Sequence, residues 1–480
     1  MPNLSRSSVH IDLNTGTQPR PVKPESDTPF RILLLGDFSG RRNRGEPPPS
    51  RLRPYLIDRD NFDEVMSRIR PELDFSTQKQ AIRLRFRELE DFHPDRIFEH
   101  ADFFEPYRSA RRSAQDPAKS AEAAAAVSGF RNAPAAPPPP PPEAAQILST
   151  GSLLDDVLEA SEKPSVASVR KPDALQAFIE RAVAPHVAPR EDPRTPELLT
   201  QVDTAAGNLM RVILHHPDFQ ALEAAWRAVF LLCRRLETGT QLKLYILDVA
   251  QSELGSTLPE LRRILVTDAV DTPGAEPWAL VAGNFTFVRN EADAALLDEI
   301  GRIAQAAGVS FLAEANPADP VSGAATRAWG TLRHSPHAAC VGLALPRFLL
   351  RLPYGRNTDS LENFAFEEMP DVVEHRRYLW GNPAFACVYL LAEAFTTDGW
   401  DMRPGSFHEI GGLPLHVYEE EGVETVKPCA EVLMTETDAE WVVEQGFMPL
   451  VSIKNQDAAR LLRFQSIADP PSRLTGAWNG

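Results

Sequence analysis

A glycine-bounded turn, Gly36–Gly40, follows a short apolar run and occupies the position that a phosphate-binding loop would have. In such loops backbone N–H groups surround the phosphates and a lysine completes the site. The lysine and the GxGxxG spacing are both missing from this sequence. The sequence therefore predicts a tight turn after a strand rather than a nucleotide site.

Two groups of histidines have side chains that could bind a metal ion. His215 and His216 precede a predicted helix, but the HExxH pattern and a third ligand at a suitable spacing are missing. His334 and His337 lie near Cys340, and the proline between them disfavours a regular helix. We therefore expect a helix cap and a core histidine at the first pair, and we predict no metal, cofactor or catalytic residue.

Two arginines flank an apolar triplet and are followed by an acidic pair. These residues are Arg347, Arg351, Glu367 and Glu368. In a chain with a formal net charge of −17, the arginines are expected to pair with one of these carboxylates inside the fold. A buried ion pair needs several hydrogen bonds to offset its desolvation. This structural role is favoured over a binding site for a substrate anion.

The composition is typical of an acidic globular protein with two or three domains. The 480 residues exceed the size of about 250–300 at which single cores stop growing. Nucleic-acid phosphates and anionic membranes would repel a chain of this charge. Neither a membrane span nor a signal peptide is predicted. Four cysteines without a CxxC pair indicate buried thiols and a cytoplasmic location.

Five arginines form an exception to the acidic balance and lie in a proline-rich stretch: Arg41, Arg42, Arg44, Arg51 and Arg53. Aromatic side chains are not interleaved with them. A solvated loop is the favoured interpretation, and a surface for an acidic partner is the alternative.

The first 27 residues are predicted to form an extended arm. Val9, Ile11 and Leu13 alternate with polar residues, as in a half-buried strand. A single strand has unpaired edges, so we expect the arm to add to another sheet, in this chain or in a neighbour. A frayed terminus is the alternative.

Periodicity divides the remainder of the chain into five parts. Residues 28–112 are predicted to form a small α/β unit, with a buried strand at Phe30–Leu35 and a helix over residues 62–70. An Ala- and Pro-rich linker follows over residues 113–146. Within 147–195 a short amphipathic helix is predicted, with its apolar stripe at Leu153, Leu154, Val157 and Leu158.

The long C-terminal part, residues 196–460, alternates helical and strand patterns and predicts a larger α/β domain. Residues 461–480 are expected to be a loose tail. The predicted fold class is α/β (α+β), with layered mixed sheets and flanking helices.

Several blocks of this sequence resemble the two contractile-sheath proteins of type VI secretion systems. Pro29–Gly40 (PFRILLLGDFSG) and Ile82–Ile97 resemble the small subunit, over roughly residues 9–112. Leu345–Gly355 (LPRFLLRLPYG) and Tyr378–Ala386 (YLWGNPAFA) resemble the large subunit, over roughly residues 148–460. The chain therefore looks like a fusion of two proteins that normally pair. The resemblance implies that the motif residues serve packing and not catalysis: Arg347, Arg351, Glu367, Glu368, Trp380 and Asn382.

The resemblance implies a structural role in an assembly. In the family, small and large subunits form dimers that stack as a helical sheath around an inner tube, and contraction drives the tube outward. An AAA+ ATPase recognises a short helix near the start of the large subunit, which Leu153, Leu154, Asp155, Val157 and Leu158 resemble. Docking of that helix on the body of this chain is the alternative. The implied partners are other sheath-like subunits, the inner tube protein, the baseplate and this ATPase.

Two departures from the family pattern leave the function open. A linker stands where the small subunit normally continues with helices, and the large-subunit resemblance stops shortly after Asn455–Ala459. The large-subunit part is therefore expected to be shortened at its C-terminus. One hypothesis is a fused sheath subunit. A second is a protein that caps, nucleates or joins a sheath to its baseplate, and a third, less favoured, is an α/β enzyme.

Overall fold

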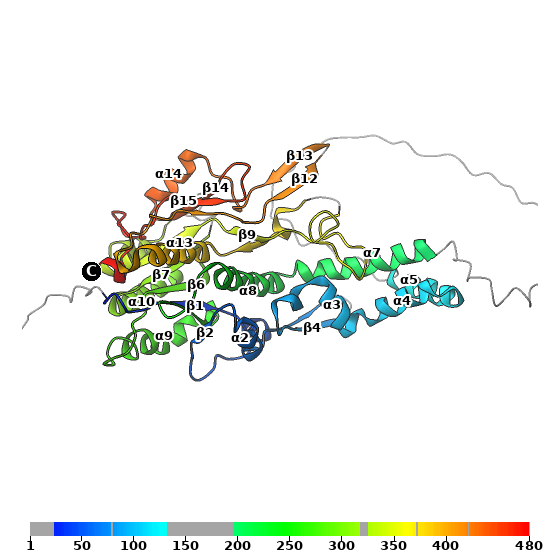
Figure 1. The fold of residues 1–480 in the computed structure, drawn as a ribbon, viewed down its shortest axis with the longest axis horizontal. Helices are drawn as coiled ribbons and strands as arrows, with labels where there is room; N and C mark the ends of the chain where they lie inside the picture. The colour runs from blue at the N-terminus through cyan, green and yellow to red at the C-terminus, as the bar shows by residue number, and fades with distance from the viewer. Residues whose placement is uncertain are drawn as a thin grey trace, which may run out of the picture. The chain divides into compact units, whose positions relative to one another are not determined.

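The computed structural model describes residues 24–77, 80–131, 195–316, 325–370, 373–420 and 422–479 (Figure 1). They belong to two compact units. The smaller is Phe103–Ala206, and the larger combines the chain up to Asp102 with the chain from Gly207 onward. The arm with Val9, Ile11 and Leu13 lies outside the described residues, and so does the predicted helix at residues 153–158.

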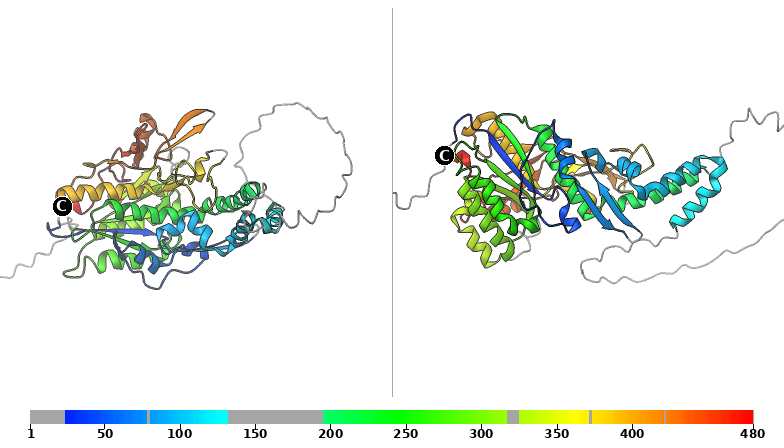
Figure 2. Two further views of the ribbon diagram at one scale, coloured as in Figure 1. Left: turned by 45° about the vertical axis from the view of Figure 1, so that its right-hand side comes forward. Right: turned by 90° about the horizontal axis from the view of Figure 1, so that it is seen from below.

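A nine-stranded mixed sheet forms the centre of the larger unit (Figures 1 and 2). Strands β5, β1, β6, β7, β8 and β14 are parallel neighbours, whereas β2 and β15 pair antiparallel with β5 and β14. In spatial order the strands are β11 (Glu409–Ile410), β15 (Ala459–Leu461), β14 (Met448–Ser452), β8 (Val341–Leu345), β7 (Ser310–Ala315), β6 (Leu280–Phe287), β1 (Phe30–Gly36), β5 (Leu242–Asp248) and β2 (Tyr55–Ile57).

Helices cover both faces of this sheet (Figure 1). Leu33 and Leu35 of β1 belong to the core that includes α9 (Leu254–Arg262) and α10 (Glu291–Ala307). The opposite face carries α8 (Pro217–Arg235) and α13 (Pro383–Asp398), where the ring centroids of Phe30 and Phe395 lie 4.7 Å apart. A strand covered on both faces has an almost continuously apolar sequence, which explains the pattern of β1. The predicted α/β class is confirmed.

Short elements complete the larger unit. The helix expected over residues 62–70 is α2 (Phe62–Ile69). The other short elements are α1 (Arg41–Arg44), β3 (Glu72–Ser76), β4 (Ala81–Arg85), α3 (Pro94–His100), α12 (Arg327–Arg333), β9 (Phe348–Arg351), β10 (Leu379–Gly381), β12 (His416–Glu420), β13 (Val423–Lys427) and α14 (Glu436–Glu444). All four cysteines are buried and unbridged, as predicted.

The smaller unit contains helices where a linker was expected. It comprises α4 (Glu105–Gln115), α5 (Ser120–Arg131) and the first part of α7 (Thr195–Leu214). The buried side chains of Ala110, Val127 and Val202 pack together. Alanine has the highest helix propensity, so the Ala-rich run of residues 121–126 forms a helix once α4 and α7 cover one side of it.

The last twenty residues also differ from the expectation of a loose tail. Ile467, Leu474 and Trp478 are buried. The backbone N–H of Ile467 donates to the carbonyl of Val341, at the start of β8, with an N–O distance of 2.9 Å. Hydrophobic residues spaced between prolines therefore pack against the sheet although they show no regular periodicity.

Candidate functional site

The turn at Gly36–Gly40 uses its backbone donors within the chain. The Asp37 carboxylate accepts from the N–H groups of Arg41 and Arg42, at 2.8 and 3.1 Å. Burial and the neighbouring Asp248 raise the pKa of Asp37. A carboxylate thus occupies the place that a phosphate would take, and the segment forms the predicted turn.

The histidines also have partners inside the chain. His216 Nδ1 accepts from the N–H of Asp218 at 3.3 Å and caps α8, as predicted. His337 is buried, and its Nε2 lies 2.7 Å from Asp298 Oδ1. His334 Nδ1 lies 2.7 Å from the carbonyl oxygen of Gly330. Among the described residues no group of three or more His, Cys, Asp or Glu side chains is arranged to hold a metal ion.

The joint between the two halves of the sequence is the most distinctive feature of the larger unit. β1 comes from the N-terminal part but lies between β5 and β6 of the C-terminal part. Phe30 pairs with Leu242 and Gly36 with Asp248 along one edge, and Ile32 pairs with Leu280 along the other. The predicted unit at 28–112 therefore shares one sheet with the larger domain, because β1 needs hydrogen-bonding partners on both edges.

A buried arginine ties the turn after β1 to the end of β5. Arg41 is 7% exposed and forms ion pairs with Asp248 and Glu253, the second at 2.9 Å. The backbone N–H of Ser39 donates to Asp248 Oδ1 at 3.0 Å. Burial disfavours the charged guanidinium, but the two carboxylates raise the pKa of Arg41 overall. The expectation that the arginine cluster forms a solvated loop is therefore wrong for Arg41.

Aromatic side chains add packing at the joint. The Trp226 indole N–H on α8 donates to the carbonyl of Phe38 at 2.8 Å. The Phe62 ring of α2 meets the Trp226 ring edge-on, with centroids 5.6 Å apart. Phe92 and Phe219 are in the same arrangement at 5.7 Å. Buried aromatic pairs contribute about 0.5–1.5 kcal/mol each beyond the area that they bury.

A second buried ion-pair network surrounds Arg351 on β9. Its Nε donates to Glu223 at 2.8 Å and its Nη1 donates to Glu368 at 2.8 Å. Both carboxylates are fully buried. Burial alone would raise the pKa of Glu368, but Arg351 and the nearby His215 lower it to about 2. Arg227 Nη2 donates to the Tyr354 hydroxyl at 2.9 Å and closes the network.

The other predicted motif residues have separate surroundings. Arg347 was expected to pair with Glu367 or Glu368, and this assignment is wrong: its Nε donates to Glu431 at 2.8 Å. Glu367 instead accepts from the N–H of Arg356 at 3.0 Å. Arg347 precedes β9 and lies beside Glu431 and Glu314, whereas Arg351 at the other end of β9 contacts Glu223 and Glu368.

Two motif residues fix backbone geometry. Asn382 is the N-cap of α13, and its Oδ1 accepts from the N–H of Ala384 at 2.9 Å. The Trp380 indole N–H donates to the carbonyl of His375 at 3.1 Å. The first contact holds the start of α13, and the second ties β10 to the segment that precedes it.

Glu223 was not expected as a partner of Arg351. A usable signal was present, because Glu223 lies four residues after Phe219 and three before Trp226 on the apolar stripe of α8. A carboxylate on such a stripe is buried and requires a cationic partner.

Comparisons with known proteins explain the shared sheet. The family model of the EvpB tail sheath N-terminal domain, VipB, matches residues 196–319 and 318–468. The type VI secretion system VipA model matches residues 4–120. The chain belongs to the type VI secretion tail-sheath family. In this sheath protein, β1 comes from the VipA-matched part, whereas β5 and β6 come from the VipB-matched part.

A curated relative agrees with this assignment. The type VI secretion system sheath protein TssC1 of Pseudomonas aeruginosa is 31% identical over 305 residues, which make up 57% of this chain. The aligned region spans 61% of the length of that relative. No helix among the described residues is long and apolar enough to cross a membrane.

Proposed function

We propose that this chain is a structural subunit of a type VI contractile sheath, in which one polypeptide supplies both the small and the large part of the protomer. The observation that carries the proposal is β1, which is hydrogen-bonded between two strands of the other part. Such a strand cannot leave without breaking two ladders of backbone hydrogen bonds. One chain would then act as a rigid sheath unit and not as two tethered domains.

The role proposed is mechanical and not catalytic, and it is placed in the cytoplasm. The polar groups that first suggested chemistry have partners inside the fold, as Asp37 has in the turn after β1. Other sheath-like subunits would be its principal partners. The inner tube protein and the baseplate would contact the assembled sheath. Residues 153–158 would offer Leu153, Leu154, Asp155, Val157 and Leu158 to a recycling AAA+ ATPase.

The N-terminal arm is proposed to supply a strand to a neighbouring subunit through Val9, Ile11 and Leu13. Deleting residues 1–14 is expected to leave the thermal unfolding midpoint unchanged and to abolish assembly. Unfolding of the deletion variant would show instead that the arm belongs to the core of its own chain.

Electron microscopy of the purified full chain, alone and with the other sheath proteins of its system, tests the function. Extended tubes that incorporate the chain along their length are the expected result. Discrete particles or rings bound only at tube ends would contradict the proposal and establish the capping or baseplate role.

A further inference from the structure

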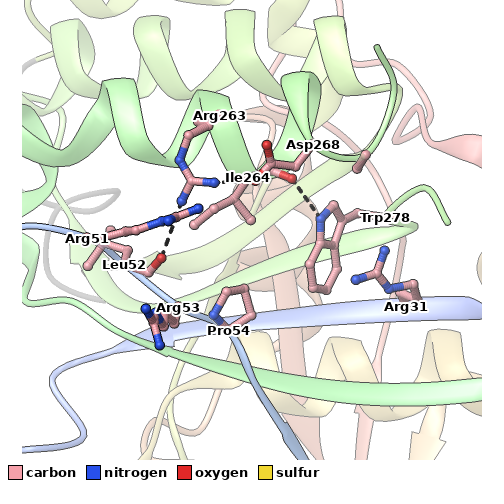
Figure 3. Close-up of a pocket in the computed structure, with 10 residues that line it drawn as sticks. Arg31, Arg51, Leu52, Arg53, Pro54, Arg263, Ile264, Asp268 and Trp278 are labelled. Carbon is pink, nitrogen blue, oxygen red and sulfur yellow. Dashed lines mark hydrogen bonds and ion pairs between the residues drawn. The ribbon is translucent and has the colours of Figure 1, made fainter. Parts of the chain in front are cut away.

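A group of arginines surrounds a tryptophan on one side of the larger unit (Figure 3). We call this group the arginine face; it consists of Arg31, Arg51, Arg53 and Arg263 around Trp278. The guanidinium carbon of Arg31 lies 3.9 Å from the centroid of the Trp278 ring. Arg263 is already paired with Glu260, at 3.0 Å, and with Asp268. The pocket between these side chains has a volume of about 360 Å³.

Two of these arginines lack a close anionic partner among the described residues. Arg51 and Arg53 are exposed on either side of Leu52, which is 3% exposed and part of the core. The buried leucine holds the backbone of this segment against the core. Neither Arg51 nor Arg53 forms a hydrogen bond or an ion pair with a described residue, and Arg51 contributes at longer range, after Arg263, to the lowered pKa of Glu260. Arg31 is paired with Glu276, and Arg263 with two carboxylates, so the positive charge of the arginine face comes from Arg51 and Arg53.

The hairpin formed by β12 and β13 carries exposed negative charges. Glu419 lies directly across from Glu424, and Glu420 across from Val423. All four side chains are exposed, Val423 at 65%. Like charges directly opposite each other destabilise an antiparallel pair. No ion pair to these glutamates is formed within the part of the chain that the structure describes. A cationic partner from outside the chain would remove this repulsion.

The hairpin and the arginine face lie on opposite sides of the larger unit. In Figure 1 the hairpin is at the upper edge, whereas α9 and β2, which border the arginine face, are at the lower edge; Figure 2 agrees. Two different patches on opposite sides allow a head-to-tail contact between copies, which gives a ring if the rotation closes and a helical filament if it does not.

We propose that Glu419 and Glu424 of the β12–β13 hairpin of one copy bind the arginine face of the next copy. The inference rests on the proposed sheath function and names one interface through which copies of this chain meet. At a net charge of −17, copies repel at long range, so close contact requires local complementarity of this kind.

Charge reversal in the full-length chain tests the contact. The variants are R51E/R53E and E419K/E424K. The matched controls are R87E/R463E and E440K/E444K, which make the same changes in net charge at exposed side chains elsewhere. Sedimentation velocity measures association between copies, and circular dichroism confirms that each variant is folded. This assay does not require tubes, so it separates failure of the contact from failure of the sheath function.

Each reversed variant alone is expected to associate at least about tenfold more weakly than the natural chain, because like charges then face each other. The controls should keep the natural affinity. An equimolar mixture of the two reversed variants should regain association, since each then meets a complementary surface. Unchanged association of the reversed variants, or a mixture that stays dissociated, would overturn the proposal. Weakening by R51E/R53E but not by E419K/E424K would also overturn it, and would assign the arginine face to another acidic segment.

Discussion

The joint and the surface hairpin use charged residues in opposite ways. In the interior, Arg41 at the joint and Arg351 on β9 are buried, and each contacts two carboxylates. On the surface, Arg53 and Glu419 are exposed and form no ion pair with a described residue. The buried charges are thus satisfied within one chain, whereas these exposed charges are the ones that we propose to pair with another copy.

Substitution of Leu34 by aspartate should cause the largest loss of stability. Leu34 is fully buried in β1, so an ionised carboxylate there would lack both water and a partner, at a cost of several kcal/mol. The variant is expected to lose soluble, folded protein. Leu56→Asp is the control in the same sheet, since Leu56 on edge strand β2 is 45% exposed. Comparable unfolding midpoints for the two variants would contradict the central position of β1.

Arg351→Met should cause the second-largest loss of stability. It removes the cation that two fully buried carboxylates share and leaves Glu223 with Arg227 and Glu368 with His215. Breaking a buried pair in this way costs about 3–5 kcal/mol. The matched control is Arg68→Met, whose exposed pair with Glu64 is worth less than about 0.5 kcal/mol. Urea denaturation measures the free energy of unfolding of both variants. An Arg351 variant as stable as the control would show that the network does not hold β9 to α8.

Glu314 should make stability depend on pH. Burial raises the pKa of Glu314 to about 7 although Arg347 opposes the change. Since the folded pKa lies above the unfolded value of 4.5, the contribution of this group is present below pH 4.5 and is lost as the pH rises through 7. Glu314→Gln removes this loss, so the variant should gain on the order of 1–3 kcal/mol relative to the natural chain between pH 5 and 8. Parallel pH profiles in urea denaturation would contradict the assignment.

The smallest effect is expected at the hairpin. Glu424→Lys replaces a like-charge pair with an opposite-charge pair across from Glu419, which is worth about 0.2–1 kcal/mol. The variant should therefore be slightly more stable than the natural chain in urea while associating more weakly with other copies. A loss of stability would show that the two glutamates are already neutralised within the chain.

The elements that the sequence predicted correctly are those with local signals. A continuous apolar run predicted β1, periodic apolar residues predicted α2, and the histidine pair predicted the cap of α8. The position of β1 between β5 and β6 depends on partners more than 200 residues away, and no local pattern encodes such a pairing. The helix α5 was not predicted, because its stability depends on packing against distant residues as well as on alanine content.

The candidate site was predicted less completely. Arg351 and Glu368 were identified as residues of one buried network, but Glu223 was overlooked because it is 128 residues from Arg351. Arg41 was expected in a solvated loop because its partner Asp248 is 207 residues away in the sequence. Charges that pair over long separations are recognisable only as unexplained charges on apolar faces.

A protease-cleavable insertion after Pro142, at the end of the proline run, tests most directly whether the two matched parts form one protomer. After cleavage, the two fragments are expected to elute together in size-exclusion chromatography and to separate only in denaturant, because β1 stays hydrogen-bonded between β5 and β6. Fragments that elute separately under native conditions would contradict the account.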